Sequence, residues 1–394
     1  GYPILSSFSE YRRGDANKDG KINIADLIRY KKLAAGENAE EAERADLDGD
    51  GNISGTDLAK VRLYLLKYSE PEKESVPKTL HSETGNTYNL VWNDEFDKDG
   101  LDYNKWCFGY ENGPASGYEN MLLLTEQDDP SIVTAEGGLL KMNARRYFDK
   151  SRPEIKYATS NSLGTRETMN FKYGYVEMRA MVPTRQSAFP AFWSIGKPGL
   201  INKKNNGYYT EMDFFECFSH RFEMIANFHK WYDNGAHTNF DPNTSKKNGT
   251  SVGNSEYRYF YFKDYKTLPY EFHLYAFEWT KEYIKVYIDN ECFVTLDITM
   301  SYDGEWEYGN SINTTVKLDP TAAKDMSGYH DYTYLLLQNL IYNSELSENG
   351  VTAGSVFPYR FYVDYVRLYQ DKNNSDNGLI YLNDAGEKVN YYSN

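Results

Sequence analysis

The chain has 394 residues and a formal net charge of −15 at pH 7. Such an acidic chain lacks the positive surface that nucleic acids and anionic membranes require, so we expect neither as a partner. No apolar run is long enough to cross a membrane, and three cysteines are too few for a disulfide framework. Tyrosine is abundant, with 37 residues, and its flat ring with a polar edge suits contact with sugars.

Two acidic loops near the N-terminus have the spacing of calcium-binding loops, in which oxygen ligands occupy positions 1, 3, 5, 7, 9 and 12 around a glycine at position 6. Gly20 and Gly51 stand at position 6 of the two loops. The expected ligands are Asp15, Asn17, Asp19, the Lys21 carbonyl, Asn23 and Asp26 in the first loop, and Asp46, Asp48, Asp50, the Asn52 carbonyl, Ser54 and Asp57 in the second. We expect each loop to bind one calcium ion.

Each calcium loop precedes a run with helical spacing, Leu27 to Ala35 and Leu58 to Tyr68, and neither follows a convincing incoming helix. This pair of loop–helix repeats resembles a type I dockerin. The resemblance implies a small all-α module that docks, in the presence of calcium, onto a cohesin module of a scaffold protein. It also implies secretion as part of a cellulosome-like complex.

The sequence predicts four segments. Residues 1–68 form the calcium-binding module, residues 69–87 a linker with two prolines, residues 88–371 a second domain, and residues 372–394 a polar tail. The second domain consists of short runs rich in Tyr, Phe, Val and Ile between turn residues, without long helical periodicity. This pattern predicts an all-β sandwich of antiparallel strands. A tight turn at Asp289-Asn290 predicts a hairpin within it.

The run EMDFFE at residues 211–216 places three carboxylates on one short aromatic strand. Because strand side chains alternate, Glu211 and Asp213 share a face and Glu216 points away from it. A β-bulge at residues 214–215 would return Glu216 to that face and let both phenylalanines pack underneath. Three like charges on one face repel, so the arrangement makes sense where one acid must stay protonated near neutral pH.

Retaining glycosidases require such a pair of acids. One carboxylate attacks the anomeric carbon while a second, about 5 Å away and with a raised pKa, protonates the leaving oxygen and later activates water. We predict Glu211 as the nucleophile and Glu216 as the acid/base. Asp213 would share a proton or a hydrogen bond with the nucleophile and help to separate the two glutamate pKa values. Cys217 should face away from the acids, into the core.

Five motifs together resemble glycoside hydrolase family 16, in the order of that family. They are LVWNDEF at 90–96, YGYVEMRA at 173–180, FPAFW at 189–193, EMDFFE at 211–216 and FYVDYVRLY at 361–369. The resemblance covers about residues 88 to 371. It implies a β-jelly-roll of two curved antiparallel sheets and an endo-acting hydrolase that cleaves β-linked polysaccharide with retention of configuration.

The resemblance also implies residues that bind the substrate. Trp193 would form the floor of a sugar subsite, His229 would reach toward the acid/base, and Asn339 would hydrogen-bond the sugar. Trp231 is a second aromatic residue that we expect to contact the glycan. The family trait of a structural calcium ion would place one near Asp364. We expect no organic cofactor and, apart from cohesin docking, a monomer.

Two departures from the family pattern leave the substrate open. Residues 189–190 are Phe-Pro where relatives that cut β-1,3-glucan usually carry Trp-Pro, and residues 118–121 are YENM where those relatives carry an Asn-Glu-Leu run. We expect a β-1,3- or β-1,3-1,4-glucan as the substrate, with a galactose-based glycan as the alternative. A carbohydrate-binding adaptor without catalysis is the other alternative, but an adaptor would not need the three acids of the EMDFFE motif.

Overall fold

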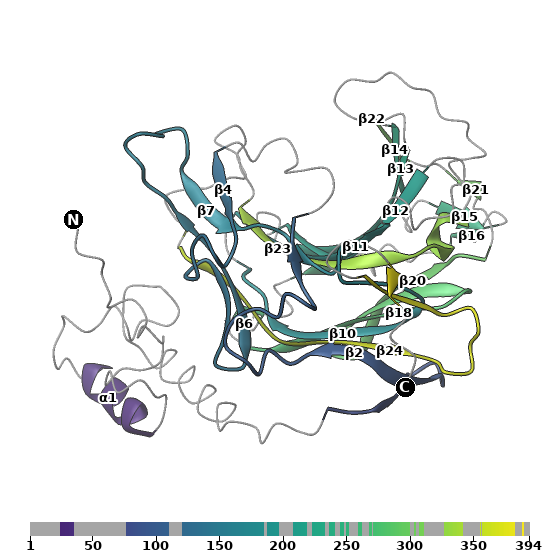
Figure 1. The fold of residues 1–394 in the computed structure, drawn as a ribbon, viewed down its shortest axis with the longest axis horizontal. Coiled ribbons are helices and arrows are strands. Elements are labelled where there is room, and N and C mark those ends of the chain that lie inside the picture. Colours follow the sequence, from purple (N-terminus) through teal and green to yellow (C-terminus); the bar gives the residue numbers. More distant parts are fainter. Residues whose placement is uncertain are drawn as a thin grey trace. The chain divides into compact units, whose positions relative to one another are not determined.

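The computed structural model in Figure 1 divides the chain into two compact units, Gly1–Pro77 and Lys78–Asn394. It describes residues 24–34, 76–109, 120–184, 187–196, 208–218, 223–232, 236–240, 245–247, 250–251, 259–261, 268–269, 271–299, 303–304, 307–310, 327–341, 355, 357–382 and 388–389.

The described part of the first unit is one helix, α1, which spans Ile24–Ala34. Tyr30 and Leu33 are buried, whereas Lys31 and Lys32 lie exposed in the last turn, where positive charge is favourable. The helix overlaps the first of the two helices that the sequence predicts. The second predicted helix and the calcium ligands up to Asn23 and from Asp46 onward lie outside the described residues, as does the side chain of Asp26.

In the second unit, the described residues form two large sheets, which Figure 1 shows as stacked layers. Sheet A has the order β20-β19-β18-β10-β24-β6-β7-β4, with β2 beside β24, β1 beside β2 and β5 beside β6. Its strands are β1 (Thr79–His81), β2 (Thr87–Asp94), β4 (Met121–Leu124), β5 (Val133–Glu136), β6 (Leu139–Arg146), β7 (Tyr157–Ser160), β10 (Gly174–Met181), β18 (His273–Trp279), β19 (Tyr283–Ile288), β20 (Glu291–Asp297) and β24 (Tyr359–Gln370). The pairing of β4 with β7 is parallel and the other pairings are antiparallel.

Sheet B has the order β22-β14-β13-β12-β11-β23-β9-β25-β26, with β17 beside β13 and with β8 joining β3 to β23. Its strands are β3 (Cys107–Phe108), β8 (Leu163–Gly164), β9 (Met169–Lys172), β11 (Ala188–Gly196), β12 (Tyr208–Phe218), β13 (Glu223–Tyr232), β14 (Ala236–Phe240), β17 (Tyr259–Tyr261), β22 (Glu307–Asn310), β23 (Thr333–Ile341), β25 (Gly378–Leu382) and β26 (Lys388–Val389). A small third sheet contains β15 (Ser245–Lys247), β16 (Thr250–Ser251) and β21 (Asp303–Gly304).

The main core lies between sheets A and B and is rich in aromatic rings. Phe214 of sheet B stacks on Phe277 of sheet A, with ring centroids 3.4 Å apart, and Phe192 of sheet B packs edge-on against Phe214. Such rings bury large apolar areas, which is why short aromatic strands suffice to hold the two sheets together. The predicted all-β sandwich is confirmed.

The predicted hairpin is also present, as β19 and β20. Asp289 and Asn290 form its two-residue turn with φ values of 50° and 69°. Two successive positive φ angles are the requirement of a type I′ turn, which Asn and Asp tolerate better than most residues. Cys217 is buried in the core, as expected, and none of Cys107, Cys217 and Cys292 forms a disulfide bond.

The second unit begins inside the segment expected to be a linker. Strand β1 pairs with β2, and the turn between them is held by the buried carboxylate of Glu278 on β18. Four side chains donate hydrogen bonds to Glu278 Oε1, namely Ser82 (2.9 Å), Thr84 (2.6 Å), Asn86 (3.0 Å) and Tyr88 (2.8 Å), and Tyr287 donates to Oε2 (3.0 Å). Residues 79–87 therefore belong to the sandwich.

The segment expected to be a polar tail also contributes to sheet B. Strand β25 pairs with β9, and the hydroxyl of Tyr381 donates a hydrogen bond to the Val91 carbonyl at 3.1 Å. A third contact comes from Gln370, whose side-chain amide donates to the Gly378 carbonyl at 2.9 Å. The chain thus continues to add strand structure after β24.

We predict that Glu278 stabilises the sandwich only while it is ionised. Burial raises the pKa of Glu278, but the hydrogen bonds from Thr84, Asn86, Tyr88 and Ser82 outweigh burial and lower it below its usual value. A lowered pKa gives stability that is present above the usual value and is lost as the pH falls through the folded-state value. Glu278→Gln should therefore reduce the free energy of unfolding by about 2 kcal/mol at pH 7, and by much less below about pH 4.

Urea unfolding of both proteins across this pH range measures the effect. Glu282→Gln is the matched control, because Glu282 is exposed and its ion pair with Lys281 has a long N–O distance of 3.8 Å. A loss for Glu278→Gln that is the same at pH 7 and pH 3.5 would contradict the role of the ionised carboxylate.

Candidate active site

Strand β12 carries the three acids of the EMDFFE motif and contains the predicted bulge. Asp213 pairs with Asn227 of β13, and Glu216 pairs with Ile225. Residues 214–215 therefore stand opposite a single residue of β13, which defines a β-bulge. The extra residue allows one strand to bury two consecutive phenylalanines: Phe214 is 2% exposed and Phe215 is 1% exposed.

The bulge brings all three acids to the face of sheet B that points away from the core. Across β11, Glu211 pairs with Ile195, Asp213 with Trp193, and Glu216 with Ala191. Positions 191, 193 and 195 alternate along one strand, so their partners share one face, while Phe192 between them belongs to the core. We refer to this face, with Glu211, Asp213 and Glu216, as the acid face.

The three acids differ in burial. Glu211 and Glu216 are half-buried, whereas Asp213 is only 2% exposed. Burial disfavours the charged form of a carboxyl group and raises the pKa of Asp213 well above its usual value. A protonated Asp213 can donate a hydrogen bond to a neighbouring carboxylate, which keeps that neighbour ionised. The acid face therefore holds a buried acid with a raised pKa between two more accessible glutamates.

His229 lies at the Glu211 end of the acid face. It pairs with Glu211 across β12 and β13, and its Nε2 is 3.1 Å from Asp213 Oδ2. One side-chain oxygen or nitrogen atom from each of Glu211, Asp213 and His229 lies within 4.8 Å of the other two. Among the described residues this is the one group of three or more His, Cys, Asp and Glu side chains that could hold a metal ion.

The expectation that His229 reaches toward the acid/base Glu216 is wrong. Glu216 pairs with Ile225, which is four residues before His229 on β13. The imidazole instead contacts the aspartate and the predicted nucleophile. The physical reason is the register of β12 and β13, which the bulge shifts by one residue after Asp213.

Trp193 lies on the acid face directly beside Asp213. It is 6% exposed and packs with Ile195, Tyr334 and other residues in an apolar cluster separate from the main core. Its position next to the acids agrees with the predicted sugar subsite, which remains a prediction. Trp231 follows His229 by two positions on β13, and its side chain lies outside the described part of the chain.

Asn339 does not face the acids, which corrects the prediction from the sequence. Its side chain is fully buried on the inner face of β23, and its Nδ2 donates hydrogen bonds to the carbonyls of Met142 (2.8 Å) and Tyr359 (3.0 Å) in sheet A. These bonds connect the two sheets inside the sandwich. Asn339 is a structural residue, because its amide is used within the protein.

Gln338, next to Asn339, is the residue of this run that the sequence analysis missed. It pairs with Ala191, which in turn pairs with Glu216, so Gln338 shares the acid face. The amide Nε2 of Gln338 donates to Ser162 Oγ at 2.6 Å. Leu335 and Leu337 lie in the core and Leu336 lies in the apolar cluster beside Trp193, so the same alternation places Gln338 on the acid face. Because both faces of β23 are apolar, the sequence alone does not show this alternation.

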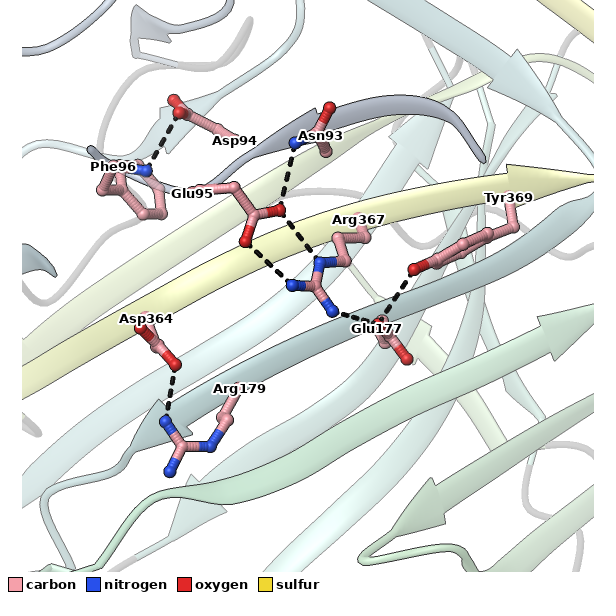
Figure 2. A network of polar contacts seen from close by, with 9 residues as sticks. All are labelled: Asn93, Asp94, Glu95, Phe96, Glu177, Arg179, Asp364, Arg367 and Tyr369. Carbon is pink, nitrogen blue, oxygen red and sulfur yellow. Dashed lines mark hydrogen bonds and ion pairs between the residues drawn. The ribbon is translucent and has the colours of Figure 1, made fainter. Parts of the chain in front are cut away.

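The outer face of sheet A carries a second set of charged residues, drawn in Figure 2, and there Glu95, Glu177 and Asp364 each pair with an arginine. Arg367 donates to both oxygens of Glu95 at 2.9 Å and to Glu177 at 3.2 Å. Arg179 donates to Asp364 at 2.5 Å. The guanidinium group of Arg179 therefore neutralises Asp364, and a calcium ion near this side chain stays a prediction.

Comparison with known proteins identifies the family to which the chain belongs. The family model "Glycosyl hydrolases family 16" matches residues 132–333, and the model "Dockerin type I domain" matches residues 13–66. The first match covers half of the chain and includes the whole of β12. The chain belongs to glycosyl hydrolase family 16, with a type I dockerin domain at its N-terminus. Both resemblances inferred from the sequence are confirmed.

Characterised relatives are distant. The chain is 24% identical over 292 residues to glucan endo-1,3-beta-glucosidase A1 of Niallia circulans, a match that covers 72% of this chain and 38% of that protein. It is 24% identical over 290 residues to the clotting factor G alpha subunit of Tachypleus tridentatus, covering 73% and 35%. It is 26% identical over 288 residues to a beta-glucanase of Rhodothermus marinus, covering 72% and 85%. The chain thus spans little more than a third of the first two relatives.

Solved structures agree with the fold. SCLam, a non-specific endo-beta-1,3(4)-glucanase, superposes with a TM-score of 0.50 at 22% identity and covers 77% of this chain and 98% of its own. The endo-beta-1,3-glucanase from Pyrococcus furiosus also has a TM-score of 0.50, at 19% identity, covering 75% and 98%. At these identities the likeness establishes the two-sheet fold alone.

We predict that the buried carboxyl of Asp213 costs stability. Because burial raises its pKa, the stability of the wild-type protein is complete below the usual aspartate value and falls as the pH rises through the folded-state value. Asp213→Asn cannot ionise, so its free energy of unfolding should exceed that of the wild type at pH 8 by on the order of 1 kcal/mol, and the two should converge near pH 4.

Thermal and urea unfolding at several pH values measure this difference. Asp364→Asn is the control, since Asp364 is paired with Arg179 and its removal should not stabilise the protein. A wild type more stable than Asp213→Asn at pH 8 would mean that the folded protein holds Asp213 ionised.

Proposed function

We propose that the chain is an endo-acting β-glycanase that hydrolyses β-1,3- or β-1,3-1,4-glucan with retention of anomeric configuration. The observation that carries the proposal is the bulged strand β12, which presents Glu211, Asp213 and Glu216 on one face with the middle acid buried. Family membership and the similarity to the Rhodothermus marinus beta-glucanase support the substrate class.

The first half of the reaction forms a covalent intermediate. The ionised carboxylate of Glu211 attacks the anomeric carbon while Glu216 donates its proton to the leaving glycosidic oxygen. The bond from carbon to the leaving oxygen breaks, and the chain fragment that carries the new hydroxyl departs. An ester between Glu211 and the remaining sugar results, with its anomeric configuration inverted.

The second half restores the enzyme. Glu216, now a carboxylate, removes a proton from water, and the resulting hydroxide attacks the anomeric carbon and displaces Glu211. The second inversion returns the original β configuration. We assign Asp213, whose pKa is raised by burial, the role of hydrogen-bond donor to Glu211, which favours the ionised nucleophile. His229, 3.1 Å from Asp213, orients the aspartate.

The sugar identity requires direct measurement. Incubation with laminarin, lichenan, curdlan and a set of galactans, followed by identification of the released oligosaccharides, separates the glucanase from the galactanase alternative. Internal cleavage gives a range of oligosaccharide lengths at early times. Binding to one of these glycans without any product would instead support an adaptor that has lost catalysis.

The roles of the two glutamates predict a chemical rescue. Glu216→Ala should lower turnover of a polysaccharide by several orders of magnitude, because no group protonates the leaving oxygen. With an aryl β-glycoside whose leaving group needs no proton, the Glu211 ester still forms, and azide then displaces it to give a β-glycosyl azide. Proton NMR of the product distinguishes this β-azide from the α-anomer.

Glu211→Gln tests the nucleophile under the same conditions, where azide should rescue nothing. Glu136→Gln is the matched control for loss of a glutamate charge, because Glu136 is exposed on β5 of sheet A, and it should retain full turnover. Formation of an α-glycosyl azide by Glu216→Ala, or normal turnover by Glu211→Gln, would refute the assignment.

We further propose that the dockerin domain docks the enzyme onto a cohesin outside the cell, with one calcium ion in each loop. The spacing of carboxylate and carbonyl oxygens in both loops and the dockerin family match support this. The ligands lie at the start of each repeat, so ion binding and helix formation are coupled. Without calcium, the clustered aspartates repel one another and oppose folding of the loops.

The docking proposal predicts that cohesin binding requires calcium and glucan hydrolysis does not. Chelation, or Asp15→Ala combined with Asp46→Ala, should abolish binding to every cohesin in a panel measured by calorimetry. The same variant should hydrolyse soluble glucan at the wild-type rate, and Glu211→Gln should bind cohesin normally. Tight cohesin binding that survives complete removal of calcium would contradict the assignment.

A further inference from the structure

A short 3₁₀ helix, η3 (Ser327–His330), lies between the two sheets and contacts the catalytic strands from the core side. We refer to residues 327–330 as the bridging segment. Tyr329 is fully buried in the main core and packs edge-on against Phe228 of β13, with ring centroids 6.2 Å apart. The indole N–H of Trp279, on β18 of sheet A, donates to the Tyr329 carbonyl at 2.9 Å. The segment therefore contacts both sheets.

Two hydrogen bonds connect the bridging segment to β12 and β13. The hydroxyl of Thr210 donates to the Gly328 carbonyl at 3.2 Å, and the hydroxyl of Tyr329 donates to the His229 carbonyl at 3.3 Å. Thr210 immediately precedes Glu211, and His229 is the residue that pairs with Glu211. Both contacts thus fix the main chain at the site where the candidate nucleophile and the imidazole stand side by side.

The other side of the bridging segment is bonded to rigid parts of the sandwich. His330 Nδ1 is 2.8 Å from the Tyr173 hydroxyl, and His330 Nε2 is 3.0 Å from the Ile298 carbonyl. The ring of Tyr173 packs edge-on against Trp279, with centroids 5.1 Å apart. Because both nitrogens of His330 and the carbonyl of Tyr329 are engaged, the segment has little freedom to shift relative to sheet A.

We propose that Tyr329 is a positioning residue, whose hydroxyl holds the His229 main chain and so keeps the imidazole against Asp213. The inference deepens the proposed function and rests on it. Strand β13 pairs with β12 at one edge and with β14 and β17 at the other, and the Tyr329 hydroxyl adds a bond to its main chain from the core side. A hydroxyl that bonds to the His229 carbonyl from the core side fixes the position of His229 relative to the core and does not occupy the acid face. Small displacements of this kind are costly to catalysis, because reactive groups work within narrow distances.

The direct test is Tyr329→Phe, which removes one oxygen and leaves the ring packing in place. We expect kcat to fall about 5-fold with KM unchanged, the size of effect that loss of one buried hydrogen bond gives. The matched control is Tyr359→Phe. Tyr359 is also fully buried, and its hydroxyl is 2.9 Å from Ser187 Oγ in another part of the sandwich. That variant should lose a similar amount of stability and retain the wild-type kcat.

A double-mutant cycle decides whether Tyr329 acts through His229. In a His229→Ala background, Tyr329→Phe should cause no further loss of kcat, because the positioned group is already absent. An equal loss in both backgrounds would overturn the proposal, and so would a Tyr329→Phe variant with unchanged kcat.

An NMR measurement separates this proposal from the proposed function. The chain has six histidines, so the ring resonances of His229 can be assigned in a ¹⁵N-histidine-labelled sample by comparison with His229→Ala. Tyr329→Phe should shift these resonances and Tyr359→Phe should not. A wild type without activity on any glycan would refute the proposed function, while the shift would still support the positioning contact. Unshifted His229 resonances in Tyr329→Phe would refute the positioning contact even in an active enzyme.

Discussion

The alternation of side chains along β12 is the constraint on which the site depends. A regular strand cannot bury Phe214 and Phe215 together and also present Glu211, Asp213 and Glu216 on the opposite face. One extra residue solves both problems, because it gives two consecutive rings to the core and shifts the register after Asp213. The rings stack on sheet A, so the packing of the core holds the bulge, and the bulge sets where the acids lie. The same bulge therefore determines both the packing of the core and the position of the acids.

Two buried acids in this chain illustrate how surroundings determine the charge of a carboxyl group. Glu278 is fully buried, yet five hydroxyl and amide donors surround it, and its pKa lies below the usual value. Asp213 is almost as buried, and burial raises its pKa well above the usual value. The first group stabilises the fold when ionised. The second opposes folding when ionised, which is the behaviour of a group retained for chemistry.

The sequence contained enough information for the sheet class, the hairpin at Asp289-Asn290 and the bulge, because each has a local signature: strand alternation, a turn dipeptide and a motif one residue too long. It did not contain enough to predict which face of β23 carries Asn339, because β23 is apolar on both faces and its alternation cannot be assigned without partner strands. The direction of His229 depends on the register of β13, which a single strand does not encode. Strand β1 has three residues, and the turn after it is hydrogen-bonded to Glu278, which is almost two hundred residues away in the sequence.

The topology also separates the point where the chain enters the second unit from the acid face. The chain enters the second unit at Lys78, and the first strands, β1 and β2, join sheet A beside β24. The turn between them is fastened to Glu278, which belongs to β18 of the same sheet. The acids belong to sheet B, and their contacts with sheet A run through packed rings and through the bridging segment. A mechanical force applied at Lys78 therefore acts first on the hydrogen bonds of sheet A. In the scaffold docking that we propose, such a force therefore reaches sheet A before the contact between His229 and Asp213 on sheet B.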